Sequence, residues 1–189
     1  MGPDYGVERG NLNQSVRQKS AEPAWPDALY DLLRAEGVTL FAYVPDAGHK
    51  VLIERSLVDP AAKSIPLTTE EEGVGVLAGA NLGGTKGVLL MQSSGVGNCV
   101  NFLSLIKGGR FPFLTLVSMR GDYGEGNPWQ MPMGQATERV LEAMGVICMR
   151  IENAEDVLPT VTASLTMTFK SGNAVAVLLT QKLLGAKAF

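Results

Sequence analysis

The stretch LTTEEEGVGVLAGANLGGTKGVLLMQSSGVGN, residues 67–98, decides the fold of this chain. It opens with three carboxylates, continues through a segment rich in glycine and alanine, and reaches an apolar run that ends in a turn-rich SSGVGN. This order predicts a helix over 70–84, a buried strand over 87–92 and a loop leading into a helix over 95–106. Each interior glycine costs the first helix about 1 kcal/mol against alanine, so we expect its backbone to approach another backbone or a ligand.

The same alternation continues on both sides of this stretch. Apolar runs typical of buried strands lie at 38–44, 113–119, 146–151 and 174–180, and a short strand ends near 67. Helical spacing lies between them, at 27–36, 49–57, 137–144 and 154–169. Alternating strands and helices predict an α/β fold in three layers, with a mostly parallel six-stranded sheet and helices on both faces. Ligands bind such sheets at the carboxyl ends of the strands, where the long aperiodic loop 120–136 also lies.

Length and composition limit the candidate classes. The 189 residues, of which 46% are hydrophobic, suffice for one domain with a sizeable core. We expect a flexible tail over 1–24, which is poor in apolar residues, and a single domain over 25–189. A net charge of −3 without a basic block disfavours nucleic acid and membranes as partners. The two cysteines lack CxxC spacing and no apolar run reaches about 18 residues, so we expect a cytoplasmic protein.

Each polar feature of the sequence, taken singly, is compatible with plain α/β architecture. Acids in the first turn of a helix complement its dipole, which alone would account for Glu70, Glu71 and Glu72. The SSGVGN turn matches neither GxGxxG nor GxxxxGKS, although a strand-to-helix turn with glycines can hold a cofactor. His49 is the only histidine, which disfavours a histidine-rich metal site and a Ser-His-Asp triad. Only the combination of these features is informative.

In combination, residues 28–189 resemble the pyrimidine-binding (Pyr) domain of thiamine-diphosphate enzymes. The resemblance is carried by FAYVPDAG (41–48), TTEEEGVGVLAGANLGG (68–84), LMQSSGVGNCVNFLSLI (90–106) and RGDYGEGNPWQMPMGQAT (120–137). It is nearest to sulfopyruvate decarboxylase α subunits and to the matching half of phosphonopyruvate decarboxylases. In these decarboxylases MQ-S-SG-G-N stands where other family members carry TSGPG.

The resemblance implies thiamine diphosphate as the cofactor and a glutamate that contacts N1′ of its aminopyrimidine ring. Counting back from Ala78-Gly79 in the family's register gives Glu70 as this acid. Relatives with Glu-Gly at the acid itself indicate Glu72 instead, so both stay open. Glu71 points about 100° away from either neighbour on a helix and is expected to be the most solvated of the three.

Further site residues follow from the same resemblance. Asp46 matches a catalytic or substrate-facing acid of related decarboxylases. The cofactor-facing turn corresponds to Gln92, Ser93, Ser94, Gly95 and Asn98. His49 and Arg120 are candidates for binding the anionic end of the substrate.

One part of the family pattern is missing. Full-length members carry a second domain in which Gly-Asp-Gly and a downstream asparagine hold Mg²⁺ and the diphosphate, whereas Gly121-Asp122 is followed here by Tyr123. The resemblance therefore implies a β-type partner chain that supplies this site. The chain would be the α subunit of a two-chain thiamine-diphosphate decarboxylase acting on sulfopyruvate or a similar anionic 3-substituted pyruvate. The alternative is a non-catalytic Pyr-like domain that binds a partner or a small ligand.

Overall fold

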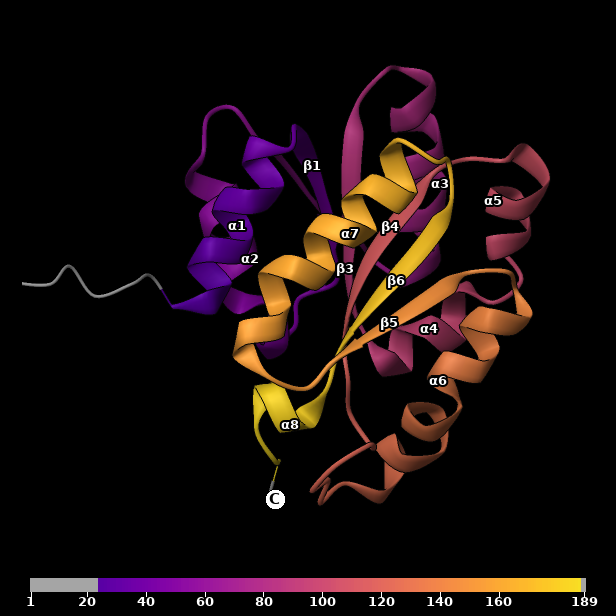
Figure 1. Ribbon diagram of the computed structural model, residues 1–189. Helices are drawn as coiled ribbons and strands as arrows, with labels where there is room; N and C mark the ends of the chain where they lie inside the picture. Colours follow the sequence, from indigo (N-terminus) through magenta and orange to yellow (C-terminus); the bar gives the residue numbers. More distant parts are fainter. Residues whose placement is uncertain (1–23, 188–189) are drawn as a thin grey trace, which may run out of the picture.

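The computed structural model describes residues 24–187, which form one parallel sheet between two layers of helices (Figure 1). The strands lie in the order β2-β1-β3-β4-β6-β5, and every neighbouring pair is parallel. Their bounds are β1 (Val38–Tyr43), β2 (Lys63–Pro66), β3 (Lys86–Gln92), β4 (Phe113–Ser118), β5 (Ile147–Ile151) and β6 (Ala174–Leu179). The expected three-layer α/β fold is confirmed. The tail expected over 1–24 lies outside the described residues, apart from Ala24.

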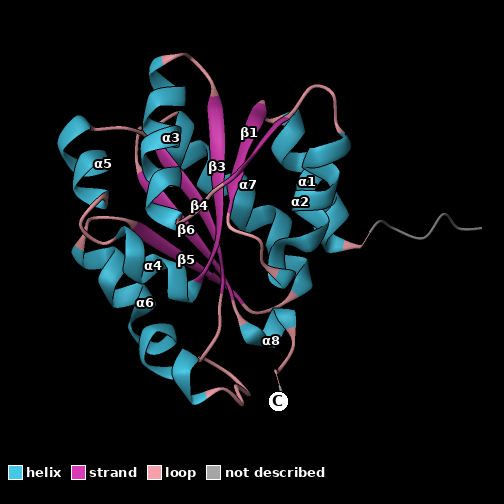
Figure 2. Cartoon of the chain, turned by 180° about the vertical axis from the view of Figure 1, so that it is seen from behind, coloured by secondary structure: helices cyan, strands magenta, loops and turns pink. Residues whose placement is uncertain are grey.

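Helices cover both faces of the sheet (Figure 2). One face carries α1 (Trp25–Ala35), α2 (Lys50–Val58) and α7 (Val157–Phe169). The other carries α3 (Glu70–Leu82), α4 (Ser93–Cys99), α5 (Leu103–Gly109) and α6 (Met131–Ala143). A short α8 (Gln181–Leu184) follows β6, and three 3₁₀ turns complete the elements, η1 (Ala47–His49), η2 (Pro128–Gln130) and η3 (Ala154–Asp156). Among residues 24–187, none of the helices has the length and apolar character needed to cross a lipid bilayer.

The apolar run of β3 is continuous because both of its faces are buried. Val88 and Leu90 belong to the core beneath α1, α2 and α7, whereas Leu89 and Met91 belong to the core beneath α3 to α6. Side chains of a strand alternate between the two faces of its sheet, so a strand covered on both sides needs apolar residues at every position. This explains why the sequence pattern located the central strand well.

The helices differ from the sequence-based expectation at several places. The expected helix over 95–106 is divided into α4 and α5, because Gly95, Gly97 and the β-branched Val100 all weaken a continuous helix. α6 begins inside the expected loop, since Pro132 near its start is favourable in a first helical turn. The α3 glycines do not approach another backbone as expected: a Cβ built at Gly73 would meet the side chains of Leu67 and Leu89, and one built at Gly79 has no neighbour within 4 Å.

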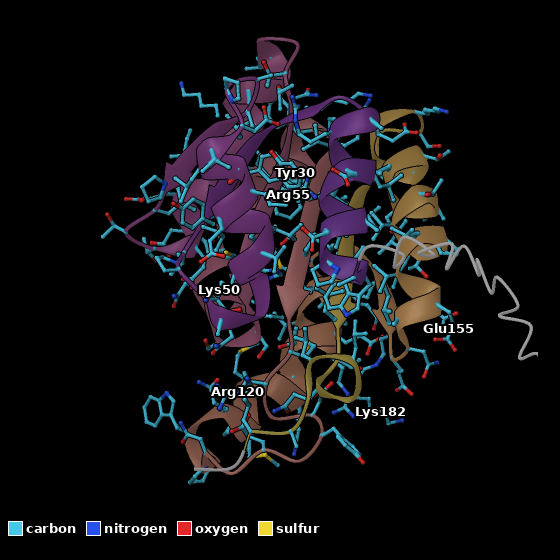
Figure 3. The ribbon with its side chains drawn as sticks, turned by 90° about the vertical axis from the view of Figure 1, so that its left-hand side faces the viewer. Tyr30, Lys50, Arg55, Arg120, Glu155 and Lys182 are labelled. Carbon is cyan, nitrogen blue, oxygen red and sulfur yellow. The ribbon has the colours of Figure 1, made fainter. Side chains whose placement is uncertain are left out.

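A polar brace joins α1 to α2 at one edge of the molecule (Figure 3). The guanidinium carbon of Arg55 lies 4.4 Å from the centre of the Tyr30 ring, and Arg55 Nη2 donates to Asp31 Oδ1 at 2.6 Å. Burial and the nearby Asp59 carboxylate raise the pKa of Tyr30 to about 12. The brace holds α1 and α2 together on one face of the sheet.

Candidate active site

The carboxyl edge of the sheet, at the bottom of Figure 1, collects the candidate residues. Asp46 follows β1, Glu70 begins α3 after β2, and Gln92 ends β3 immediately before α4. Arg120 follows β4. These turns come from different parts of the sequence. Because all six strands are parallel, the turns that follow their carboxyl ends lie along one edge of the sheet.

Glu70 is buried at this edge, with 8% of its surface exposed. Asn98 Nδ2 donates to its Oε2 at 2.8 Å, whereas its Oε1 accepts no hydrogen bond from residues 24–187. The backbone of α4 lies directly against the carboxylate, since a Cβ built at Gly95 would overlap the carboxyl carbon and Oε1. Glycine is therefore required at position 95 for Glu70 to hold this position.

Glu70 borders an open groove of about 820 Å³, which we call the Glu70 groove. Ser94, Gly95 and Asn98 form the polar side of this groove together with Glu70. The opposite side comes from η2 and the start of α6 and contains Trp129, Pro132 and Met133. The indole of Trp129 is 83% exposed, so the groove has an apolar wall that stands open to solvent.

The other two glutamates of the run face away from this groove. Glu72 Oε2 accepts at 2.9 Å from the backbone N–H of Thr68, the residue before Thr69, which caps α3. Glu71 is half-buried and accepts from Thr69 Oγ1 at 3.1 Å. The expectation that Glu71 is the most solvated of the three is wrong: Glu72 is the exposed one, because its side chain turns back over the helix end.

Asp46 is held by three donors from three elements. Its Oδ2 accepts from Gly48 N at 2.9 Å and from Ser118 Oγ at 2.6 Å, and its Oδ1 accepts from Gln92 Nε2 at 3.1 Å. Gln92 Oε1 in turn accepts from Ser94 Oγ at 2.9 Å. A chain of hydrogen bonds thus joins Asp46 to Ser94, which borders the Glu70 groove. Sequence reasoning missed Ser118, because an isolated serine at a strand end carries no local signal.

Ser93 serves a different part of the edge from Ser94. It is fully buried, and its Oγ accepts from Arg120 N at 3.0 Å. Its carbonyl accepts from Thr137 Oγ1 at 3.5 Å. Ser93 therefore joins α4 to the loop after β4 and to α6, and it does not border the Glu70 groove.

His49 lies beneath the edge, with 1% of its surface exposed. Its Nε2 lies 3.2 Å from the carbonyl oxygen of Met91 and donates to it, while its buried Nδ1 has no partner among residues 24–187. Burial lowers the pKa of the ring, and the neighbouring Asp46 only partly opposes this effect. The 3₁₀ turn η1 directs the imidazole toward β3, so its position does not support direct contact with a substrate.

His49 gives the chain a pH-dependent stability that can be measured. The unfolded chain binds a proton near pH 6.5, whereas the folded ring binds one only at lower pH, so the free energy of unfolding should fall as pH drops below about 6.5. The slope can reach about 1.4 kcal/mol per pH unit. Urea unfolding from pH 7.5 to 5.5 should show this slope, and His49→Gln should flatten it because the chain has no other histidine. Equal slopes for both proteins would contradict the assignment.

Arg120 is fixed by a buried carboxylate from its own loop. Its Nε and Nη2 both donate to Glu125, and the Nη2–Oε1 distance is 2.6 Å. The Arg120 guanidinium is the main cause that holds the pKa of Glu125 at about 2, and Glu125 raises the pKa of Arg120. Gln181 Nε2 and Asn127 N also donate to Glu125, at 3.0 and 2.9 Å. Arg120 therefore has a defined orientation beside Asp46.

Asp122, the acid of Gly121-Asp122, is engaged within the fold. Its Oδ2 pairs with Arg150 Nη2 at 3.0 Å, and its Oδ1 accepts from Gln181 N at 3.2 Å. Gln181 Oε1 accepts from the N–H groups of Asp122 and Tyr123. Over the described part of the chain, no three His, Cys, Asp or Glu side chains are grouped as metal ligands would be.

The chain resembles known proteins in sequence and fold. No family model matches it. It is 42% identical over 121 residues to sulfopyruvate decarboxylase subunit alpha of Methanococcus maripaludis, which covers 64% of this chain and 72% of that protein. It is 34% identical over 154 residues to the subunit of the same name from Methanothermobacter thermautotrophicus. That match covers 81% of this chain and 93% of the relative.

Longer proteins match over part of their length. A phosphonopyruvate decarboxylase of Streptomyces viridochromogenes is 37% identical over 130 residues, 68% of this chain and 33% of that protein. The structure of 2-oxoglutarate:ferredoxin oxidoreductase from Magnetococcus marinus superposes with a TM-score of 0.69 at 18% identity, over 85% of this chain and 29% of that one. At that identity the superposition shows a shared fold. The matches to the shorter relatives show more: this chain belongs to the family of sulfopyruvate decarboxylase α subunits.

Proposed function

We propose that this chain is the α subunit of a two-chain, thiamine-diphosphate-dependent decarboxylase that acts on sulfopyruvate or a similar anionic 3-substituted pyruvate. Its relatives carry the name of that enzyme's α subunit. The observation that carries the proposal is the setting of Glu70. One carboxylate oxygen is held by Asn98 and the other accepts no hydrogen bond from residues 24–187, at the border of a groove.

The residues of the Glu70 groove fit the pyrimidine end of the cofactor. A flat heteroaromatic ring needs an apolar wall and a few fixed polar groups, and here Trp129 and Met133 supply the first while Glu70 and Ser94 supply the second. When bound, thiamine diphosphate would supply the electron sink for the pair released with CO₂. Glu70 would share a proton with a ring nitrogen through its Oε1, and Asn98 would fix the carboxylate for that exchange.

Asp46 is proposed as the acid on the substrate side. Its three donors leave the carboxylate in one orientation, so that a proton can be held or passed on at a fixed place. The path through Gln92 to Ser94 connects it to the Glu70 groove. Asp46 thus lies at one end of a hydrogen-bonded segment whose other end, Ser94, borders the same groove as Glu70, which suits two separate proton-handling roles in one reaction.

A β-type partner chain is proposed to hold the diphosphate and Mg²⁺. The Gly121-Asp122-Tyr123 segment departs from Gly-Asp-Gly, and the carboxylate of Asp122 is already paired with Arg150. The exposed apolar wall at Trp129 is the kind of surface that a partner subunit covers. The cofactor would then lie between the two chains, with this chain contributing the pyrimidine side.

The experiment is to isolate the native complex with thiamine diphosphate and Mg²⁺ present, determine its mass, and assay sulfopyruvate decarboxylation. We expect a hetero-oligomer with bound cofactor, and activity only when both chains are combined. Activity from the verified pure chain would contradict the partner requirement. A homo-oligomer without cofactor or activity would favour the alternative, a non-catalytic domain in which the three glutamates only complement the dipole of α3.

A further inference from the structure

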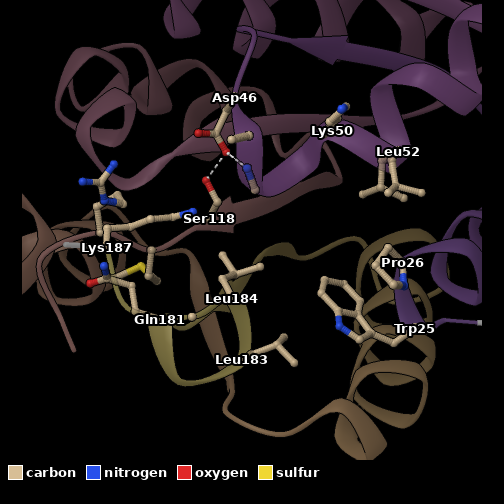
Figure 4. Close-up of a pocket in the computed structure, with 16 residues that line it drawn as sticks. Trp25, Pro26, Asp46, Lys50, Leu52, Ser118, Gln181, Leu183, Leu184 and Lys187 are labelled. Atoms are coloured by element: carbon tan, nitrogen blue, oxygen red, sulfur yellow. Dashed lines mark hydrogen bonds between the residues drawn. The ribbon is translucent and has the colours of Figure 1, made fainter. Parts of the chain in front are cut away.

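A second cavity, drawn in Figure 4, is lined from α1, α2 and α8, whereas the Glu70 groove is lined from α3, α4 and α6. We call it the Asp46 pocket, and its volume is about 280 Å³. That volume holds a small organic acid but not a whole cofactor. The pocket is formed by the start of α1, the turn and first residues of α2 after β1, the end of β4 and the segment that follows β6, so it takes residues from four separate parts of the sequence.

The charged residues of the Asp46 pocket are three cations and one acid. Lys50, Arg120 and Lys187 line it together with Asp46. The charge of Arg120 is balanced by the buried Glu125. Lys50 pairs with Glu54 at 3.7 Å, but both side chains are more than 60% exposed, where such a pair contributes little. Lys187 has no ion pair among residues 24–187, and the cations of the lining outnumber its one acid, Asp46, by three to one.

Lys187 is anchored although it follows the last helix. Its N–H donates to the carbonyl oxygen of Gly124 at 3.0 Å, and its carbonyl oxygen accepts from Gly126 N at 2.8 Å. These two bonds form a parallel bridge between Lys187 and Glu125, the residue that also fixes Arg120. One short stretch of the loop after β4 thus positions both cations on the same side of the pocket. Gln181 supports the stretch from α8.

The opposite side of the pocket is apolar. Trp25 at the start of α1 and Leu184 at the end of α8 line it, and Figure 4 shows both facing the space across from Asp46 and Lys187. An apolar wall lowers the local dielectric constant, which strengthens the attraction between a cation and a bound anion. The pocket therefore combines a lysine that has no ion pair among residues 24–187, a fixed acid and a small volume beside an apolar wall.

We propose that the Asp46 pocket binds the anionic group on C3 of the substrate, a sulfonate or a phosphonate, with Lys187 as its main partner. The inference rests on the proposed function and assigns a subsite to it. A substrate of this class carries two anions with opposite needs. The carboxylate must leave as CO₂, so strong cationic stabilisation of it would slow the reaction, whereas the group on C3 is retained and can be bound tightly throughout. The negative charge of Asp46 is compatible with the carboxylate that leaves, and the positive charge of Lys187 with the anionic group on C3 that stays bound.

The test uses 3-sulfopropanoate and 3-phosphonopropanoate, which lack the 2-oxo group and cannot react. Calorimetry measures the dissociation constants of these analogues from the complete α–β complex. The complex is assembled in three forms, with the native α chain, with Lys187→Met and with Lys187→Arg. Loss of one charge-assisted contact predicts roughly 10- to 100-fold weaker binding in the methionine variant, with partial rescue by arginine. Propanoate should bind equally to all three. The analogue that loses more affinity identifies the preferred anion.

Lys182→Met is the matched control, because Lys182 lies on the neighbouring α8, pairs with Glu152 and does not line the pocket. It should bind the analogues like the native chain. In turnover, Lys187→Met should raise KM for sulfopyruvate with kcat changed only a few-fold, as expected for uniform binding. Unchanged analogue binding in Lys187→Met, or an equal loss in Lys182→Met, would overturn the inference.

The two proposals fail in different ways. If the complex decarboxylates sulfopyruvate and Lys187→Met leaves both KM and analogue affinity unchanged, the pocket assignment is wrong and the enzyme assignment stands. If the native complex binds 3-sulfopropanoate through Lys187 but decarboxylates no 2-oxo acid, the anion site is supported and the enzyme assignment is wrong.

Discussion

Glu70→Gln is expected to lower kcat for decarboxylation by about 10²- to 10⁴-fold, the range associated with loss of a positioned acid–base group. Glutamine keeps the size of the side chain and its Oε can still accept from Asn98 Nδ2. It cannot share a proton with a ring nitrogen. The fold and the assembly with the partner should therefore survive, so the loss would appear in kcat rather than in the mass of the complex.

Glu72→Gln is the matched control for this experiment. The residue lies two positions along the same helix, is exposed, and caps the backbone N–H of Thr68. Its substitution should change kcat less than about threefold and lower stability by at most about 1 kcal/mol. Steady-state kinetics and thermal unfolding of both variants separate the two acids. If Glu72→Gln were the inactive variant and Glu70→Gln the active one, the assignment of the activating acid would have to be reversed.

The fold could be predicted from the sequence because burial on both faces of a parallel sheet leaves continuous apolar runs. The run at 87–91 became β3, and the neighbouring runs became the other strands. The helix boundaries were less accurate where propensity was weak. The sequence reported glycines at 95 and 97 but could not show that the helix would stop after Cys99 and restart at Leu103.

The candidate site was only partly accessible from the sequence, because its contacts join distant residues. Ser118 binds an acid 72 positions away, and Gln181 binds Glu125 from 56 positions away. Neither has a local signature. Lys187 reaches the Asp46 pocket only through the bridge to the loop after β4. The direction of His49 depends on a single 3₁₀ turn, so the burial of this residue could not be foreseen from the sequence.

The three glutamates 70–72 also show why the sequence alone does not determine which residue faces the site. Consecutive residues in a helix point in directions about 100° apart, so a run of three must contain different environments. The pattern alone does not state which residue faces inward. That depends on α4, whose Gly95 and Asn98 surround Glu70. The catalytic roles of these residues stay predictions, and Gly95 offers an independent way to test them.

Gly95→Ala is expected to lower kcat by about 100-fold although it replaces no ionisable residue. The added methyl would overlap the carboxyl carbon and Oε1 of Glu70, so the carboxylate must move away from its place beside Asn98. A displacement of about 1 Å in a reacting group commonly costs this much in rate. Steady-state kinetics of the reconstituted complex would measure the loss, and a crystal structure of the variant would show the displaced side chain.

Gly79→Ala provides the control, since it makes the same chemical change on α3 at an exposed position where a built Cβ meets nothing within 4 Å. Alanine is favoured over glycine in a helix by about 1 kcal/mol, so this variant should be more stable and fully active. In Gly95→Ala the gain in helix propensity is opposed by the overlap with Glu70, so thermal unfolding of both variants is measured to separate a loss of activity from a loss of the fold. Full activity in Gly95→Ala would mean that the position of Glu70 does not control the reaction, and the proposed role of its carboxylate would have to be abandoned.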